Sequence, residues 1–208
     1  MPAPPKHRGA IVRAAATLFR RNGYAATGIN DIVELAGAPK GSLYHYFPDG
    51  KDQIGEAAVR FAGKGVVVTL EKLEQEHKTA ASMMQAYCRM VVGWMAKSGF
   101  RDGCPISTTL LESAPQSAGM ALAGREAFAA WRTVIARALV RDGFSKIEAR
   151  RLSTLAVSAL EGSLILARVE CSSEPIEDIA RSLAVVLRRE APARVRTSGA
   201  NTRRRVHG

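Results

Sequence analysis

Apolar residues return every three to four positions along this chain, and no stretch of useful length alternates apolar with polar residues as a strand would. The N-terminal example is one apolar stripe formed by Ile11, Ala14, Ala15, Leu18 and Phe19. Between breakers, the same spacing predicts a short second helix after Thr27 that carries Ile29, Ile32, Val33 and Ala36 on one face. Further helices are predicted at about 39–46, 51–77, 80–97, 106–113, 120–142, 146–170 and 176–190. We therefore expect an all-α fold of about nine helices.

Turn signals divide the first 50 residues into three helices. Gly23 suits the left-handed position that ends the first helix, and Thr27 is expected to cap the second. Gly37 then forms a turn, and Pro39 suits the first position of the third helix. Two short helices joined by a glycine turn and braced by a longer helix are typical of a helix-turn-helix.

The third helix has an inward and an outward side. Leu43 and Phe47 lie four residues apart and are expected to face the core of this unit. The outward residues are small, basic or aromatic, and such a surface can enter a DNA major groove about 12 Å wide. Tyr44 and His45, taken singly, could equally pack or lie in solvent.

The positive charge lies at the two ends of the chain. Residues 1–51 carry seven Lys/Arg against three Asp/Glu, and residues 188–208 carry seven against one, within a net charge of +11. Basic ends are consistent with contact to the phosphates of a nucleic acid. Solvated surface charge is the alternative, and a protein that compacts DNA without sequence preference is a rival interpretation.

Other classes of protein find no support in the sequence. Cys88, Cys104 and Cys171 have no CxxC spacing and the four histidines are scattered, so no metal site, disulfide framework or cofactor is expected. No catalytic triad or phosphate loop is present, so we do not expect an enzyme. No run of about 18 apolar residues predicts a membrane span, and a cytoplasmic protein is expected.

The segment from Thr17 to Ile54, TLFRRNGYAATGINDIVELAGAPKGSLYHYFPDGKDQI, resembles the DNA-binding signature of the TetR family of bacterial regulators. The resemblance implies that Thr27 caps the second helix and touches a phosphate, and that Lys51 contacts the DNA backbone. It also implies that five residues of the third helix face DNA: Lys40, Gly41, Ser42, Tyr44 and His45. Pro39 departs from the Ser or Thr that is common in the family.

A longer turn at PDGK is similar to the LmrA/YxaF-like branch of this family, whose members resemble repressors of multidrug-efflux and flavonoid-responsive genes. The strings Gly103-Cys104-Pro105, Phe128-x-x-Trp131 and Glu161-Gly162-Ser163 resemble its ligand and dimer domain. We hypothesise a homodimeric repressor that binds a palindromic double-stranded DNA operator and is released by a ligand. The fourth helix would bend near Gly63 and Gly65 on release.

Methionine and aromatic residues of the fifth and seventh helices indicate a pocket for a small apolar or aromatic effector, although such residues more often form plain core. The candidate ligand contacts are Met83, Tyr87, Met90, Trp94, Cys104, Phe128, Trp131 and Glu161. Glu161 interrupts an apolar face, where it pairs with an arginine such as Arg168 or offers a polar group to the ligand. A purely structural role is the other interpretation of Cys104.

The last two predicted helices combine apolar residues with small ones and are suited to a four-helix bundle between two subunits, unless both are buried within one subunit. The candidate interface residues are Leu155, Ala159, Gly162, Leu166, Ile179 and Leu183. The expected organisation is a flexible arm (1–5), a helix-turn-helix domain (6–50), a ligand-binding and dimerisation domain (51–190) and a disordered basic tail (191–208).

Overall fold

The computed structural model of this chain describes residues 7–188. The predicted all-α fold is confirmed, with nine helices in this range. They are α1 (Arg8–Asn22), α2 (Ile29–Ala36), α3 (Lys40–Tyr46), α4 (Lys51–Glu76), α5 (Ala80–Lys97), α6 (Pro105–Ser113), α7 (Ala118–Arg141), α8 (Lys146–Glu170) and α9 (Glu174–Val186). The arm and the tail predicted at 1–5 and 191–208 lie outside the described residues.

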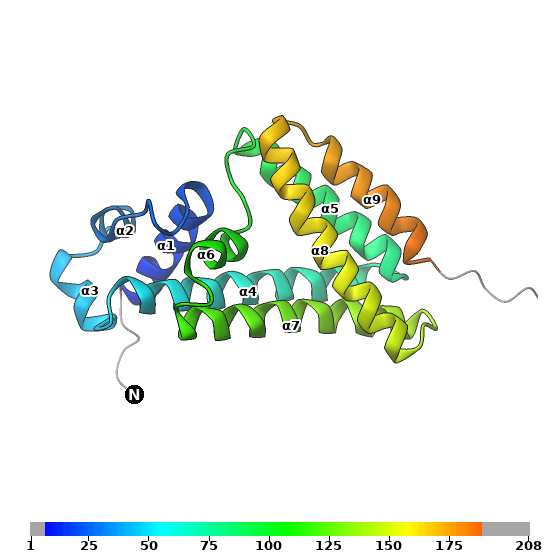
Figure 1. The fold of residues 1–208 in the computed structure, drawn as a ribbon, viewed down its shortest axis with the longest axis horizontal. Coiled ribbons are helices and arrows are strands. Elements are labelled where there is room, and N and C mark those ends of the chain that lie inside the picture. Colours follow the sequence, from blue (N-terminus) through cyan, green and yellow to red (C-terminus); the bar gives the residue numbers. More distant parts are fainter. Residues whose placement is uncertain (1–6, 189–208) are drawn as a thin grey trace, which may run out of the picture.

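The helices form a small N-terminal unit and a larger bundle (Figure 1). α1, α2 and α3 lie together at one end, and the long helices α4 and α7 run side by side away from them. α5, α8 and α9 pack together on the other side of the bundle, and α6 lies between α1 and α4. α4 is thus the element that joins the two parts.

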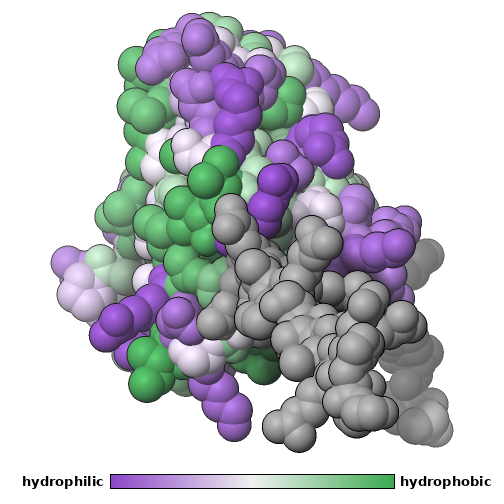
Figure 2. Space-filling model, turned by 90° about the vertical axis from the view of Figure 1, so that its right-hand side faces the viewer, coloured by the Kyte–Doolittle hydropathy of each residue, from purple (hydrophilic) through white to green (hydrophobic). Residues whose placement is uncertain are grey.

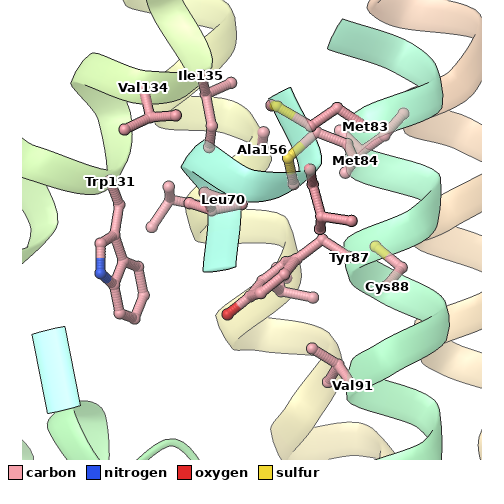
Figure 3. Close-up of a cluster of buried hydrophobic side chains, with 14 of the residues drawn as sticks. Leu70, Met83, Met84, Tyr87, Cys88, Val91, Trp131, Val134, Ile135 and Ala156 are labelled. Atoms are coloured by element: carbon pink, nitrogen blue, oxygen red, sulfur yellow. The ribbon is translucent and has the colours of Figure 1, made fainter. Parts of the chain in front are cut away.

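Two hydrophobic cores meet along α4. The N-terminal core holds Phe19, Leu43 and Phe47 with Ile54 and Ala58 from the first two turns of α4. From Val59 onward, α4 contributes to the second core. Figure 3 shows part of this second core, in which side chains of α4, α5, α7 and α8 meet: Leu70, Met83, Met84, Tyr87, Cys88, Val91, Trp131, Val134, Ile135 and Ala156.

A glycine allows α4 and α7 to approach closely. A Cβ placed on Gly63 would lie 2.7 Å from the Cβ of Ala127, which is well inside ordinary van der Waals contact. The indole N–H of Trp131 donates a hydrogen bond of 3.2 Å to the Gly63 carbonyl. A Cβ on Gly65, two residues further along α4, would meet nothing within 4 Å. α4 continues as one helix through both glycines.

Five predicted helix starts are wrong by one or two residues, and those of α6 and α7, at Pro105 and Ala118, lie one and two residues earlier than predicted. Gly28, and not Thr27, occupies the N-cap of α2, and its N–H donates to the Asp31 carboxylate at 2.9 Å. Pro39 is the N-cap of α3 with extended backbone (ψ 137°), so the helix begins at Lys40. α9 begins at Glu174 because Pro175 is tolerated in a first helical turn, where its missing N–H costs nothing.

α8 has the length and mean hydropathy of a helix that could cross a membrane, although charged residues interrupt its apolar runs. In this structure α8 packs against α7 and α9 as one helix of the bundle. Its inward stripe includes Ala149, Ala156 and Leu160, all buried. The opposite side of α8 is also apolar and is exposed, which explains the high mean hydropathy.

Candidate functional site

α3 presents its predicted outward surface at the end of the molecule (Figure 1). Leu43 and Phe47 are fully buried, as expected, and Tyr44 exposes 60% of its surface. Lys40, Gly41 and His45 are also exposed. A Cβ on Gly41 would meet nothing within 4 Å, so the backbone is open to close approach by a partner.

Two other predicted DNA contacts are already engaged within the protein. The Ser42 hydroxyl donates to the Pro39 carbonyl at 2.7 Å and remains partly accessible. The Lys51 ammonium donates to the Ala25 carbonyl at 3.2 Å and lies 4.5 Å from the centre of the Tyr24 ring. Lys51 therefore holds the turn before α2 against the start of α4.

Thr27 differs from the expectation. Its side chain is buried, and its hydroxyl donates a 2.7 Å hydrogen bond to the Gly23 carbonyl. Because the hydroxyl is inside the domain, it shapes the turn between α1 and α2. We therefore do not retain Thr27 among the candidate phosphate contacts.

A cavity of about 410 Å³ lies where α1, α4, α5, α7 and α8 meet the loop at 98–104. Five of the eight predicted ligand contacts line it: Tyr87, Trp94, Cys104, Trp131 and Glu161. The other three do not. Met83 is fully buried in the core, Met90 is exposed on α5, and Phe128 packs edge-on against Trp131 with ring centres 5.2 Å apart.

α1 forms one wall of this cavity, which the sequence did not predict. Arg13, Thr17 and Arg20 of α1 line it together with Phe61 and Gly65 of α4. The available signal was a pair of apolar residues, Val12 and Ala16, that lie beside the predicted stripe of α1 and are buried in the structure. Apolar residues beside such a stripe indicate a second packed side of the helix.

The cavity contains two polar groups with few protein partners. Glu161 accepts a 2.6 Å hydrogen bond from the Ser107 hydroxyl, and burial raises the pKa of its carboxyl. The expected pairing with Arg168 is wrong, because that guanidinium donates to the Arg21 carbonyl at 3.4 Å. The Tyr87 hydroxyl has no hydrogen-bond partner among residues 7–188, and burial raises its pKa.

Cys104 lies beside Glu161 in the cavity wall. Burial and the negative charge of Glu161 both raise the pKa of the Cys104 thiol. The thiol therefore stays protonated near neutral pH, whereas a reactive cysteine needs a lowered pKa. This supports the structural interpretation of Cys104.

The loop after α5 attaches the C-terminal end of α1 to the bundle. Asp102 is buried, and its carboxylate lies 2.9 Å from the Arg20 guanidinium and 3.4 Å from that of Arg21. The Gly103 N–H donates to the Arg20 carbonyl at 3.0 Å. We call this set of four residues the α1 joint. Arg20, Asp102 and Gly103 also line the cavity, so a ligand there would touch the joint directly.

The predicted interface residues divide between two sides of α8 and α9. Leu155 and Leu166 are about half exposed, Gly162 is exposed and Ala159 is partly so. Leu183, by contrast, is 3% exposed and belongs to the subunit core, where Ile179 also packs, so both face inward. Further apolar residues on the outer side are Ile165, Val169, Val185 and Val186.

The side of the molecule where α9 ends carries a mixed surface. Figure 2 looks at the end of the molecule where α9 ends, and hydrophobic side chains gather there in a band between polar ones.

Within residues 7–188 no group of three His, Cys, Asp or Glu could hold a metal ion, and the three cysteines are free thiols.

Two family models match the chain. The model described as bacterial regulatory proteins, tetR family, matches residues 11–58. The model described as transcriptional regulator LmrA/YxaF-like, C-terminal domain, matches residues 80–182. The two matches together span most of the chain and fall on the two parts of the fold.

Relatives along nearly the whole length are also regulators. The chain is 33% identical over 183 residues to the HTH-type transcriptional regulator YxaF of Bacillus subtilis, which covers 88% of this chain and 96% of YxaF. It is 29% identical over 182 residues to the regulator LmrA of the same bacterium, covering 88% and 97%.

Solved structures share the fold. A TetR regulatory protein from Rhodobacter sphaeroides superposes with a TM-score of 0.77 at 21% identity, covering 88% of this chain and 99% of the other. A TetR transcriptional regulator from Legionella pneumophila gives a TM-score of 0.79 at 17% identity, covering 90% and 100%.

Proposed function

Because this chain belongs to the TetR family of bacterial transcriptional regulators, with an LmrA/YxaF-like C-terminal domain, we propose that it is a repressor released from its operator by a small effector. The family is non-enzymatic, so the chain is a regulator and not an enzyme. The observation that carries the proposal is one cavity whose walls include both α1 of the DNA-binding unit and helices of the bundle. The protein would act in the cytoplasm, where its DNA lies.

The outer surface of α3 supports a role in reading DNA. Lys40 offers a cation to a guanine edge or a phosphate, and Tyr44 offers a hydroxyl to a phosphate and a ring to a thymine methyl. Gly41 leaves the backbone free to approach the groove. His45 and Ser42 add further hydrogen-bonding groups at the same surface.

The outer face of α8 and α9 supports a homodimer. A soluble helix rarely leaves large apolar side chains exposed on one face unless another surface covers them. Leu155, Leu166 and Val169 form such a face on α8, and Gly162 between them allows close approach. Two copies that pair through α8 and α9 form a four-helix bundle. Their α3 helices would then enter successive major grooves of a palindromic operator, about 34 Å apart.

The α1 joint supports a route from effector to DNA. An effector in the cavity contacts Arg20, Asp102 and Gly103, and also Gly65 on the wall formed by α4. Any shift of these groups moves α1 and the start of α4, on which α3 rests. The effector releases DNA because it binds better to the arrangement in which the two α3 helices no longer match the grooves.

The test is fluorescence anisotropy with labelled DNA from upstream of the gene for this chain and its neighbours, against scrambled DNA at the same salt concentration. We expect preference for one short palindrome by about a thousandfold or more. Lys40→Ala and Tyr44→Ala should each weaken operator binding about tenfold. Lys72→Ala is the control: it removes one exposed charge about 30 Å along α4 from Lys51 and should leave operator binding unchanged.

Equal binding to every duplex, or unchanged operator affinity in folded Lys40→Ala and Tyr44→Ala proteins, would contradict the assignment of α3. Sedimentation tests the dimer. Leu166→Glu should reduce the sedimenting mass from that of a dimer to that of a monomer. Leu111→Glu, which changes an exposed leucine of α6, should leave the mass of the dimer unchanged.

A further inference from the structure

We propose that the cavity binds a lipophilic organic monocation and that Glu161 is its counter-ion. This inference rests on the proposed function, because it names the chemical class of the effector. It begins from a partly buried carboxyl group that lines the cavity and has no cation beside it.

Glu161 lines the cavity from α8. Its carboxylate accepts a hydrogen bond of 2.6 Å from the Ser107 hydroxyl and also interacts with the Cys104 thiol, and both partners are uncharged groups. Within residues 7–188 no Lys, Arg or His lies within 4 Å of its carboxylate oxygens. The second acid of the cavity, Asp102, is already held between Arg20 and Arg21. Glu161 is therefore the acidic group left for a ligand.

The remaining charge at the cavity does not neutralise Glu161. Arg13 lines the cavity from α1, but it is on an exposed side of that helix. Arg20 is paired with Asp102 in the α1 joint. On the side of α5 and α7, the walls contributed by Tyr87, Trp94 and Trp131 carry no charge.

A buried carboxylate without a cation is costly, so an empty cavity favours the protonated acid. Burial indeed raises the pKa of Glu161. A cation that enters the cavity reverses this balance, because it stabilises the ionised form. Its binding should therefore lower the pKa of Glu161 and shift the carboxyl towards its ionised form.

The apolar walls select an organic cation over a metal ion. Ca²⁺ or Mg²⁺ requires about six oxygen ligands or retained waters, whereas this cavity offers mainly aromatic and aliphatic side chains. Tyr87 and Trp94 have ring centres 6.2 Å apart in an edge-on arrangement, and Figure 3 shows Tyr87 and Trp131 extending inward from α5 and α7. Such rings attract organic cations through their faces.

A matched pair of probes tests the proposal. Methyltriphenylphosphonium is a permanent cation, and triphenylphosphine oxide is a neutral molecule of nearly the same shape that accepts a hydrogen bond. Trp94 and Trp131 are the two tryptophans of the chain and both line the cavity, so intrinsic fluorescence reports binding of either probe. We expect the wild-type protein to bind the phosphonium at least tenfold more tightly than the oxide.

Glu161→Gln should abolish that preference, because glutamine keeps the shape and loses the charge. Glu170→Gln changes an exposed acid on the same helix and should retain it. Thermal denaturation of both variants checks that they fold. Calorimetry of the wild-type protein in two buffers of different protonation enthalpy needs no variant. Repeated across a range of pH, it should show proton release on phosphonium binding at the pH values where empty Glu161 is protonated.

The proposal is overturned if neither probe binds, if the oxide binds as tightly as the phosphonium, if folded Glu161→Gln keeps the preference, or if no proton is released at any pH in the range. Operator release is measured separately by anisotropy. Phosphonium binding that leaves operator affinity unchanged would refute the effector-released repressor and leave the cation site intact. If only the oxide released the protein from its operator, the proposed repressor would stand and the proposal of a cationic effector would be refuted.

Discussion

Replacing Gly63 with alanine should destabilise the protein, although alanine is the better residue for a helix. Within a helix, Ala is favoured over Gly by about 1 kcal/mol. At this position the new Cβ would lie 2.7 Å from that of Ala127 on α7, where both backbones are held by the surrounding helices. Overpacking of this kind costs about 1–3 kcal/mol, so after the helical gain the net loss of unfolding free energy should be about 1 kcal/mol and at most about 2 kcal/mol.

Gly65→Ala is the matched control in the same helix. Its Cβ would meet nothing within 4 Å, so only the helical preference remains, and the protein should gain about 0.5–1 kcal/mol. The difference between the two variants isolates the steric cost at the contact of α4 with α7. Combining Gly63→Ala with Ala127→Gly removes the second Cβ and should restore a large part of that cost.

The assay is urea denaturation followed by circular dichroism at one fixed protein concentration, because dimerisation makes the apparent stability depend on concentration. The double-mutant cycle should give a favourable coupling energy of about 1 kcal/mol or more. Equal unfolding free energies for Gly63→Ala and Gly65→Ala, or a coupling energy near zero, would refute the close approach of α4 and α7 at this point.

Three further predictions concern the cavity and its wall. Asp102→Asn weakens the α1 joint and should reduce the loss of operator affinity caused by a saturating effector; anisotropy with and without effector checks this, and an unchanged loss would contradict it. Burial raises the pKa of Glu161 above its usual 4.5, so the folded protein favours the protonated carboxyl. The contribution of this group to stability is therefore fully present below pH 4.5 and is lost as pH rises through the raised pKa. Glu161→Gln should therefore gain stability over the wild type between pH 4.5 and 8 in urea denaturation, and a constant difference would argue against the raised pKa. A thiol reagent at pH 8 should label only Cys171 in the native protein, while Cys88 and Cys104 should react after unfolding; fast labelling of all three would disprove their burial.

Local features of the sequence predicted the helices and the inward side of α3. Leu43 and Phe47 are four residues apart, and helix geometry alone brings them to the same side. The breakers placed helix ends to within a few residues. The cap of α2 was assigned wrongly because Thr27 and Gly28 are neighbours and both are acceptable N-caps, and only the folded turn, which buries the threonine, decides between them.

Contacts between distant segments could not be predicted in the same way. A helical period shows that Leu183 lies on the apolar side of α9, but not whether that side meets α5 of the same subunit or a partner. Likewise, Arg13 and Glu161 line one cavity although they are far apart in the sequence. Periodicity identifies which side of a helix is buried and carries no information about what covers it.

The position of α1 has a consequence for engineering. Because α1 lies in the core of the DNA-binding unit and also forms a wall of the cavity, the two parts of this protein are not interchangeable modules. A chimera that replaced the first 50 residues to obtain a new operator would also replace Arg13, Thr17 and Arg20, and so would alter the effector site. A graft that keeps the cavity must exchange the exposed residues of α2 and α3 and leave α1 in place with its loop at 98–104.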